Sequence, residues 1–379
     1  MPRFFKNTHL TGTGRDNTIR AQVCAMGKRG IHQIARLANV SIGTVDRALH
    51  GRKGIREETR KRILSIAKNI GYKPNPVARA LSVGRAAIRI GVCIPRELHF
   101  FYDQLRDGIF AEARRLEHFG VEVIYCPLKY LGAMETETVR GMLESDIQGL
   151  VITPGNPRQL TPLINEAESK NVRVICVASD MPASRRSSVV CVNPRINGRL
   201  AAELMGKFVP SRSQVAVITG MLETEDHREK TAGFSEFFPR FCPGGNVVEV
   251  IEGHEDADEA FQKCFSLLDK FKDLAGLYVN TANCLPVCRA VGARKLGGKI
   301  RLITTDLFKE MAPYFEKGTI FASIYQRPFV QGQSAIRMLG DYFIQGQPLP
   351  ATRYLNPQIV MCSNLHLFRE TRIAKRIGG

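Results

Sequence analysis

The first patterned part of the chain has apolar residues at the three- and four-residue spacing of one helix face, three times in succession. The three faces are Ile31, Ile34, Ala35 and Ala38, then Val45, Ala48 and Leu49, then Ile63, Ile66, Ala67 and Ile70. Between them, Asn39 tolerates the left-handed backbone of a tight turn, Ser41 is a natural N-cap and Gly51 a natural helix end. Two acidic residues open the third segment, 56–69, where they favour the helix dipole. The pattern predicts a helix-turn-helix module.

After Ala87 short apolar runs alternate with amphipathic segments. The apolar runs are IRIGVCI, VEVIYC, GLVITP, VRVICVAS and SVVCV in a first series, and QVAVITG, NVVEVIE, GLYVN, KIRLITTD and IFASIYQ in a second. The helical segments are 101–119, 135–146, 160–170, 197–208, 227–238, 256–271, 285–296, 307–317 and 330–344. This alternation predicts an α/β fold with two doubly wound parallel subdomains joined by a hinge, after an all-α N-terminal module. Ligands of such sheets bind at the carboxyl ends of the strands, so we expect a site in the cleft between the lobes.

These patterns divide the chain into five segments. They are a polar, aperiodic leader expected to be disordered (1–27), the helix-turn-helix domain (28–73), a short hinge helix with its linker (74–86), the bilobal domain (87–370) and a basic tail (371–379). We expect the first lobe to comprise 87–192 and 306–326, and the second lobe 193–305 and 327–370. Met26 immediately precedes the first patterned segment, which makes it an alternative start to Met1.

Charge and cysteine usage narrow the class of protein. Up to Arg85 the chain holds 18 Lys and Arg and 4 Asp and Glu, so this part carries +14 of the total net charge of +18. Such asymmetry points to a polyanionic partner for the N-terminal part. The ten cysteines lie singly, mostly in apolar stretches, which is typical of a reduced, cytoplasmic protein. No apolar run reaches the roughly 18 residues of a membrane helix, and we expect no membrane partner.

Two motifs of the basic part are more specific than its charge. They are A-x-x-A-x-V-S-x-x-T-V-x-R, beginning at Ala35, and Y-x-P-N-x-x-A-R-x-L, beginning at Tyr72. On these motifs the chain resembles the lactose-repressor (LacI/GalR) family of bacterial transcription regulators. After Ala87 it resembles that family's effector domain, which shares its fold with the periplasmic sugar-binding proteins. The resemblance, from Lys28 to Glu370, implies a homodimeric repressor that binds a double-stranded, pseudo-palindromic DNA operator under the control of a small sugar-like effector.

The resemblance implies which residues of the second helix contact DNA. A recognition helix reads base edges in the major groove with its N-terminal residues, and by the family's pattern these are Ile42, Gly43 and Arg47. An arginine can make two hydrogen bonds to one guanine, whereas Ile42 offers only apolar contact and Gly43 no side chain. Ser41 and Thr44 are expected to bind phosphates and fix the register.

The hinge segment is implied to contact the minor groove. Asn75 can cap its short helix, Ala78 holds the position where the hinge helices of two protomers touch, and Leu81 holds that of a wedge between base pairs. Asp46 departs from the family, many members of which have Ser there, and this leaves the operator sequence open.

The resemblance to ribose-binding proteins also implies a set of effector-binding residues. They are Phe100, Phe101, Ser179, Asp180, Arg228, Asn280, Asp306 and Gln326. Aromatic rings stack on the C–H face of a sugar, and carboxylate, guanidinium and amide groups suit hydroxyls that both donate and accept. Two alternatives stay open: Asp306 could cap the next helix, and Gln326 could stabilise the hinge. The aspartate usual in ribose-type sites aligns with Ala178, which alters specificity.

Other candidate chemistry in the sequence is weak. The glycines at 12 and 14 are not followed by a strand and helix, so they do not predict a phosphate loop. Residues 223–229 mix carboxylates with a histidine, but a solvated loop is a better interpretation than a metal site. Cys284 and Cys288 are expected to be two buried thiols. No nucleophile elbow occurs, and we expect no catalytic residue, metal or cofactor.

Three rival hypotheses differ in kind from a ligand-responsive regulator. A sugar-binding receptor would need no basic helix-turn-helix module. An enzyme on the same lobes would need an acid–base pair or an activated nucleophile. A DNA-architectural protein would respond to no small molecule.

Overall fold

The computed structural model describes residues 31–49, 54–70, 87–132 and 134–368. It divides the chain into two compact units, Met1–Pro76 and Val77–Gly379. The expected leader, hinge helix and basic tail, and with them Asn75, Ala78 and Leu81, lie outside the described residues. Within the described ranges, no helix is long and apolar enough to cross a membrane.

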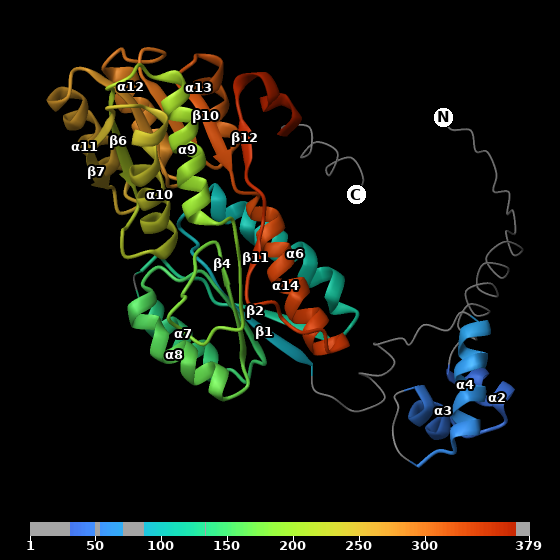
Figure 1. Ribbon diagram of the computed structural model, residues 1–379. Coiled ribbons are helices and arrows are strands. Elements are labelled where there is room, and N and C mark those ends of the chain that lie inside the picture. Colours follow the sequence, from blue (N-terminus) through green and yellow to red (C-terminus); the bar gives the residue numbers. More distant parts are fainter. Residues whose placement is uncertain (1–30, 50–53, 71–86, 133, 369–379) are drawn as a thin grey trace, which may run out of the picture. The chain divides into compact units, whose positions relative to one another are not determined.

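The described part of the first unit consists of three helices, α2 (Ile31–Ala38), α3 (Ile42–Leu49) and α4 (Glu57–Asn69) (Figure 1). Asn39 has a φ of 48°, the left-handed conformation expected for the turn between α2 and α3. The buried core takes its residues from the three predicted apolar faces, namely Ile34, Ala35, Ala38, Val45, Ala48, Ile63 and Ala67. Arg62 of α4 donates to the carbonyl of Ala38 at 2.6 Å, which satisfies one acceptor at the end of α2. The predicted helix-turn-helix module is confirmed.

The second unit is built on two six-stranded sheets, one at the centre of each lobe (Figure 1). The first sheet has the order β11-β5-β4-β3-β1-β2. Its strands are β1 (Ile88–Cys93), β2 (Val121–Tyr125), β3 (Gly149–Ile152), β4 (Arg173–Val177), β5 (Ser188–Cys191) and β11 (Arg353–Tyr354). The second sheet has the order β12-β10-β9-β8-β6-β7. Its strands are β6 (Gln214–Thr219), β7 (Asn246–Glu252), β8 (Leu274–Val279), β9 (Arg301–Thr305), β10 (Ile320–Tyr325) and β12 (Gln358–Val360). Every pairing is parallel except that of β10 with β12, so the predicted doubly wound lobes are confirmed.

Helices cover both faces of each sheet. Those of the first lobe are α6 (Phe101–Glu117), α7 (Glu135–Leu143), α8 (Pro157–Ser169) and α14 (Pro328–Gln345). Those of the second lobe are α9 (Pro194–Phe208), α10 (Glu225–Phe241), α11 (Ala257–Lys270), α12 (Cys284–Ala293) and α13 (Ala312–Glu316), with short 3-10 turns at Lys309–Met311 and Cys362–Asn364. The single helix expected at 307–317 is thus two short ones.

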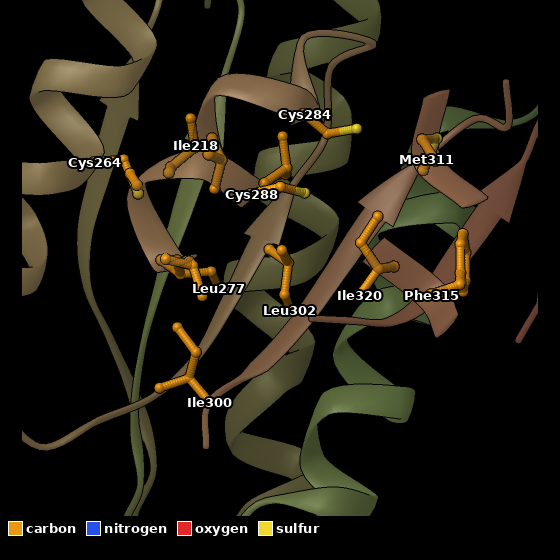
Figure 2. Packing of buried hydrophobic residues seen from close by; sticks show 14 of the residues in the cluster. Ile218, Cys264, Leu277, Cys284, Cys288, Ile300, Leu302, Met311, Phe315 and Ile320 are labelled. Carbon is orange, nitrogen blue, oxygen red and sulfur yellow. The ribbon is translucent and has the colours of Figure 1, made fainter. Parts of the chain in front are cut away.

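The second sheet shows how the alternation of a strand divides the core. Val215 and Val217 of β6 pack with α9 and α10, whereas Ala216 and Ile218 point to the opposite face. Figure 2 shows this second cluster, in which Cys284 and Cys288 of α12 lie among the apolar side chains of the sheet. Both thiols are fully buried, as expected from the sequence.

The predicted division of the lobes is wrong after residue 305. Strand β10 pairs in parallel with β9, so residues 306–325 stay in the second lobe. The chain returns to the first lobe with α14, which packs on α6, and with β11, which pairs with β5. Strand β12 then pairs with β10 in the second lobe. A β-α-β connection between neighbouring parallel strands keeps β10 beside β9, and this was not visible from periodicity alone.

Two glycines allow α14 to lie directly on α6. A Cβ atom on Gly108 would fall 1.9 Å from the carbonyl oxygen of Phe329, and one on Gly332 would fall 2.2 Å from that of Leu105. The two backbones therefore touch where the returning chain joins the first lobe.

Candidate functional sites

Helix α3 has one exposed side that begins with its first two residues. The Ser41 hydroxyl accepts from the amide of Thr44 at 3.2 Å and lies 2.9 Å from its hydroxyl, so it caps the helix as expected. Val45 and Ala48 face the core, whereas Ile42, Gly43 and Arg47 are exposed. The residues predicted to face DNA therefore lie on the free side of this helix or at its beginning.

In the second unit a cleft lies between the two lobes. First-lobe residues that line it are Leu98, Phe101, Tyr102, Leu131, Ala178 and Ser179. Second-lobe residues that line it are Thr224, Asp226, His227, Lys230, Glu255, Asn280, Thr281, Ala282, Asp306 and Gln326. Many of them directly follow strands, which is where a doubly wound sheet is expected to bind a ligand.

The first-lobe wall is aromatic and apolar. Phe101 and Tyr102 begin α6, and their rings meet edge to face with centroids 5.1 Å apart. Ala178 and Ser179 follow β4, and the Ser179 hydroxyl accepts from the amide of Asp226 at 3.3 Å. This wall is therefore lined mainly by aromatic and aliphatic side chains.

Three polar side chains at the ends of β8, β9 and β10 line the second-lobe wall. Gln326 donates to both carboxyl oxygens of Asp306, at 3.1 and 3.2 Å, and accepts from Asn197 at 3.3 Å. Burial raises the pKa of Asp306 to about 7, although Lys230 and the hydrogen bond from Gln326 act to lower it. The Asn280 amide donates to Thr231 at 2.8 Å, and its buried carbonyl oxygen has no partner among the residues that the structure describes.

The beginning of α10 adds a buried ion pair to the same wall. Lys230 is 1% exposed, and its ammonium group donates to Asp226 at 2.6 Å. The second carboxyl oxygen of Asp226, Oδ1, is buried and has no partner in the described part of the chain. An ion pair with one open acceptor can bind a group that donates a hydrogen bond.

A second polar group of the wall centres on Glu255. Its Oε1 accepts from the hydroxyl of Thr281 at 2.5 Å and lies 3.5 Å from Nε2 of His227. His227 Nδ1 accepts from the amide of Met221 at 3.1 Å. That nitrogen therefore carries no proton, and the proton of the neutral ring is on the nitrogen that faces Glu255.

The lobes are hydrogen-bonded to each other on both sides of the cleft. On one side Thr224 donates to the carbonyl of Gly155, and Asn156 donates to Glu223, both at 2.9 Å. On the other side Gln104 donates to the carbonyl of Leu307 at 2.8 Å and accepts from Tyr325 at 3.0 Å. The two lobes therefore close over the cleft.

Five of the eight residues predicted to bind an effector line the cleft. They are Phe101, Ser179, Asn280, Asp306 and Gln326. Asp306 does not cap the next helical turn, whose N-cap is Phe308. Gln326 bonds Asn197 and Asp306 where the chain passes from β10 to α14, so its alternative role at the hinge stays open.

The other three predicted residues point elsewhere, which corrects their expected positions. Arg228 is exposed and pairs with Glu225, because it lies about 200° around α10 from the cleft-lining Asp226 and Lys230. Asp180 binds the guanidinium of Arg186, with one bond of 2.7 Å. Phe100 leaves the cleft and stacks on Phe308.

The charged residues Asp226, Lys230 and Glu255 of this wall are not among the predicted effector-binding residues. The stretch 223–229, expected as a solvated loop, instead begins α10, with Asp226 and His227 buried. A signal was present: Lys230, Phe234 and Phe238 are spaced four apart, so the buried phenylalanines place Lys230 on the inner stripe. No group of side chains suited to a metal ion occurs in the described ranges.

Comparison with known protein families gives two matches. Residues 30–75 match the model for bacterial regulatory proteins of the lacI family, and residues 90–348 match that for the periplasmic binding protein domain.

Individual relatives agree with these matches. The chain is 25% identical to catabolite control protein A of Priestia megaterium over 254 residues. The matched region covers 66% of this chain and 73% of the relative. Over 231 residues it is 23% identical to the HTH-type transcriptional repressor PurR of Vibrio parahaemolyticus, covering 61% and 66%. A solved ABC transporter solute-binding protein from Burkholderia graminis, in complex with D-arabinose, matches with a TM-score of 0.69 and 23% identity over 74% of this chain and 98% of its own. That likeness shows the fold of the second unit.

Proposed function

This chain belongs to the lacI family of bacterial regulatory proteins, with a periplasmic binding protein domain as its larger part, and we propose that it is a repressor whose operator affinity is switched by a small sugar. The observation that carries the proposal is the cleft, where buried polar side chains of one lobe face aromatic side chains of the other. Joined to a helix-turn-helix unit, such a cleft supplies the two sites that a ligand-responsive DNA-binding protein needs.

On the DNA side, α3 is proposed as the recognition helix. Its exposed Arg47 would bond a guanine, Ile42 would contact a thymine methyl, and the hydroxyls of Ser41 and Thr44 would bind phosphates. A homodimer would place two such helices on the half-sites of a pseudo-palindromic operator. The proposal also gives Asn75, Ala78 and Leu81 their minor-groove roles on the strength of the family resemblance.

On the effector side, the two walls suit the two kinds of surface on a sugar ring. The C–H face would lie against Phe101, and the hydroxyls would bond Asn280, Asp306 and the ion pair of Asp226 with Lys230. The likeness to a solute-binding protein solved with D-arabinose supports a monosaccharide as the occupant.

The proposed mechanism is a population shift between open and closed lobes. A ligand that contacts both walls binds the closed form better, and closure would in turn change the affinity of the DNA-binding unit for its operator. A coupling free energy of about 1–3 kcal/mol would change operator affinity roughly 5- to 150-fold. Such a protein acts by binding rather than catalysis, and because its partner is chromosomal DNA we propose that it works in the cytoplasm.

Two measurements test the proposal. In the first, selection of DNA fragments from a random library by the purified protein should give a pseudo-palindromic consensus sequence. In the second, a thermal-shift screen of monosaccharides should give a compound that binds the protein and changes its affinity for that consensus sequence. A ligand at 100 times its Kd stabilises its domain by about 2.7 kcal/mol, which a melting curve resolves. DNA binding without any sugar response would favour the architectural rival. Sugar binding without a DNA consensus would favour the receptor.

A further inference from the structure

Every charged side chain that lines the cleft belongs to the second lobe. The carboxyl groups are those of Asp226, Glu255 and Asp306, and Lys230 is the one cation among the described lining residues. The first lobe contributes aliphatic, aromatic and hydroxyl side chains. A ligand in the closed cleft therefore meets its counter-charges on one wall only.

The cation of this wall is already neutralised. Lys230 is 1% exposed, and its ammonium group lies 2.6 Å from Asp226 while also acting on Asp306, the pKa of which it lowers. The histidine adds no charge, because its Nδ1 accepts from the amide of Met221. An anionic ligand would therefore face more negative than positive charge, in a site where burial makes that repulsion strong.

Two acceptor atoms of the cleft also favour an uncharged or cationic ligand over an anion. Asp226 Oδ1 and Asn280 Oδ1 are buried acceptors without a partner in the described structure. Hydroxyl and ammonium groups donate to such oxygens, whereas the oxygens of a phosphate dianion or a carboxylate cannot.

We propose that the cleft selects its effector by charge: it binds a small polyhydroxylated ring that is uncharged or carries an amino group, and it excludes phosphorylated and acidic sugars. This inference rests on the proposed function of the same cleft and adds the ligand class. Asp226 and Glu255 are its specificity-determining residues, since each keeps a negative charge on the wall that the ring must face.

The test is calorimetric titration of the full-length protein at neutral pH with matched series of glucose and galactose. Each series contains the parent sugar, its 2-amino derivative, its uronic acid and its phosphate ester. In a series whose members bind, the amino sugar should bind at least as tightly as the parent, and the two anions about 100-fold more weakly or not at all. An anion that binds within about tenfold of its parent overturns the inference.

Variants that remove a single charge test which residues cause the preference for the uncharged sugar. Asp226→Asn and Glu255→Gln each remove one negative charge and keep an acceptor oxygen, so each should reduce the preference for the parent over the phosphate ester about tenfold. Glu229→Gln is the matched control, because Glu229 lies on the same helix but pairs with Arg195 outside the cleft. The Glu255 variant leaves the buried ion pair intact, so it decides the matter if Asp226→Asn fails to fold.

The outcomes separate this inference from the proposed function. Unchanged preferences in variants that still bind the parent sugar overturn charge selection and leave the sugar-responsive regulator standing. Failure of both series and of the wider monosaccharide screen removes the sugar effector, and charge selection falls with it.

Discussion

The rings of Phe100 and Phe308 lie stacked across the two lobes, with centroids 4.0 Å apart and planes inclined by 14°. Phe100 precedes α6 of the first lobe, and Phe308 belongs to the core of the second. Phe100 has a φ of 60°, a conformation that costs a residue with a side chain about 1–3 kcal/mol. This turn places the ring of Phe100 against the other lobe. We therefore expect the stack of Phe100 on Phe308 to stabilise the closed form of the lobes, and we call this contact the latch.

Removal of this latch should open the cleft. An aromatic pair contributes about 0.5–1.5 kcal/mol beyond its buried area, so Phe100→Ala should weaken the affinity for a cleft ligand roughly 2- to 12-fold. The unliganded variant should also have a larger radius of gyration by small-angle scattering, because fewer contacts hold the lobes together.

The control for this variant is Phe261→Ala. Phe261 stacks on Phe265 within the second lobe, at 5.7 Å, so its loss should lower stability without opening the cleft. If Phe100→Ala loses ligand affinity but keeps the scattering profile of the wild type, then Phe100 acts on the ligand and not as a latch.

Asp306 should give the protein a pH-dependent stability. Its pKa is about 7 in the folded protein, chiefly because of burial, and about 3.9 in an unfolded chain. The folded protein thus holds this proton more tightly, and the associated stability is full below about pH 4 and is lost as the pH rises to about 7. The unfolding free energy of wild type minus that of Asp306→Asn should therefore fall with pH, by at most about 1.4 kcal/mol per unit. Urea denaturation of both proteins between about pH 5 and pH 8 measures it, and a difference that is constant over this range contradicts the burial of an ionisable carboxyl.

The sequence predicts the wall of the cleft best where side chains directly follow strands. Asn280, Asp306 and Gln326 end three buried apolar runs, and the ends of parallel strands meet at one edge of a sheet. Helical residues are harder, because two residues that are two positions apart, such as Arg228 and Lys230, face about 200° apart on a helix. The resemblance implies Arg228 from its place near a helix start, whereas the spacing of Lys230 to Phe234 and Phe238 gives the correct face.

Contacts between lobes were beyond the sequence. Nothing in the local pattern places Phe100 against Phe308, since these residues belong to different sheets and the contact depends on closure. The division of the lobes failed for a related reason. The strand 320–325 could pair with β9 or join the other sheet, and its apolar pattern is the same in both cases.

The touching backbones of α6 and α14 should make Gly108 intolerant of any side chain. Gly108→Ala would place a methyl group 1.9 Å from the carbonyl oxygen of Phe329, and overpacking of this kind costs about 1–3 kcal/mol. Gly141→Ala in α7 is the matched control, because its Cβ meets nothing within 4 Å and alanine favours a helix by about 0.5–1 kcal/mol. Urea denaturation should show opposite signs for the two variants. A neutral Gly108→Ala would mean that α14 can move away from α6 without loss.

Arg47 should carry sequence preference and not merely charge. It is exposed on α3 and lies outside the helical core, so Arg47→Ala should leave the melting temperature unchanged. If the guanidinium bonds a guanine, its loss costs about 1–3 kcal/mol, or roughly 5- to 150-fold in operator affinity, and relaxes the preference at one base pair.

The control for Arg47 removes the same charge from another helix of the same unit. Lys68 is exposed in the last turn of α4, and Lys68→Ala should weaken binding to the operator and to random DNA by the same small factor. Titrations of both variants against the selected operator and against single-base variants of it distinguish the roles. Equal losses of Arg47→Ala on operator and random DNA would assign Arg47 to a phosphate. Base reading by α3 would then rest on Ile42, which offers an apolar contact and no hydrogen bond.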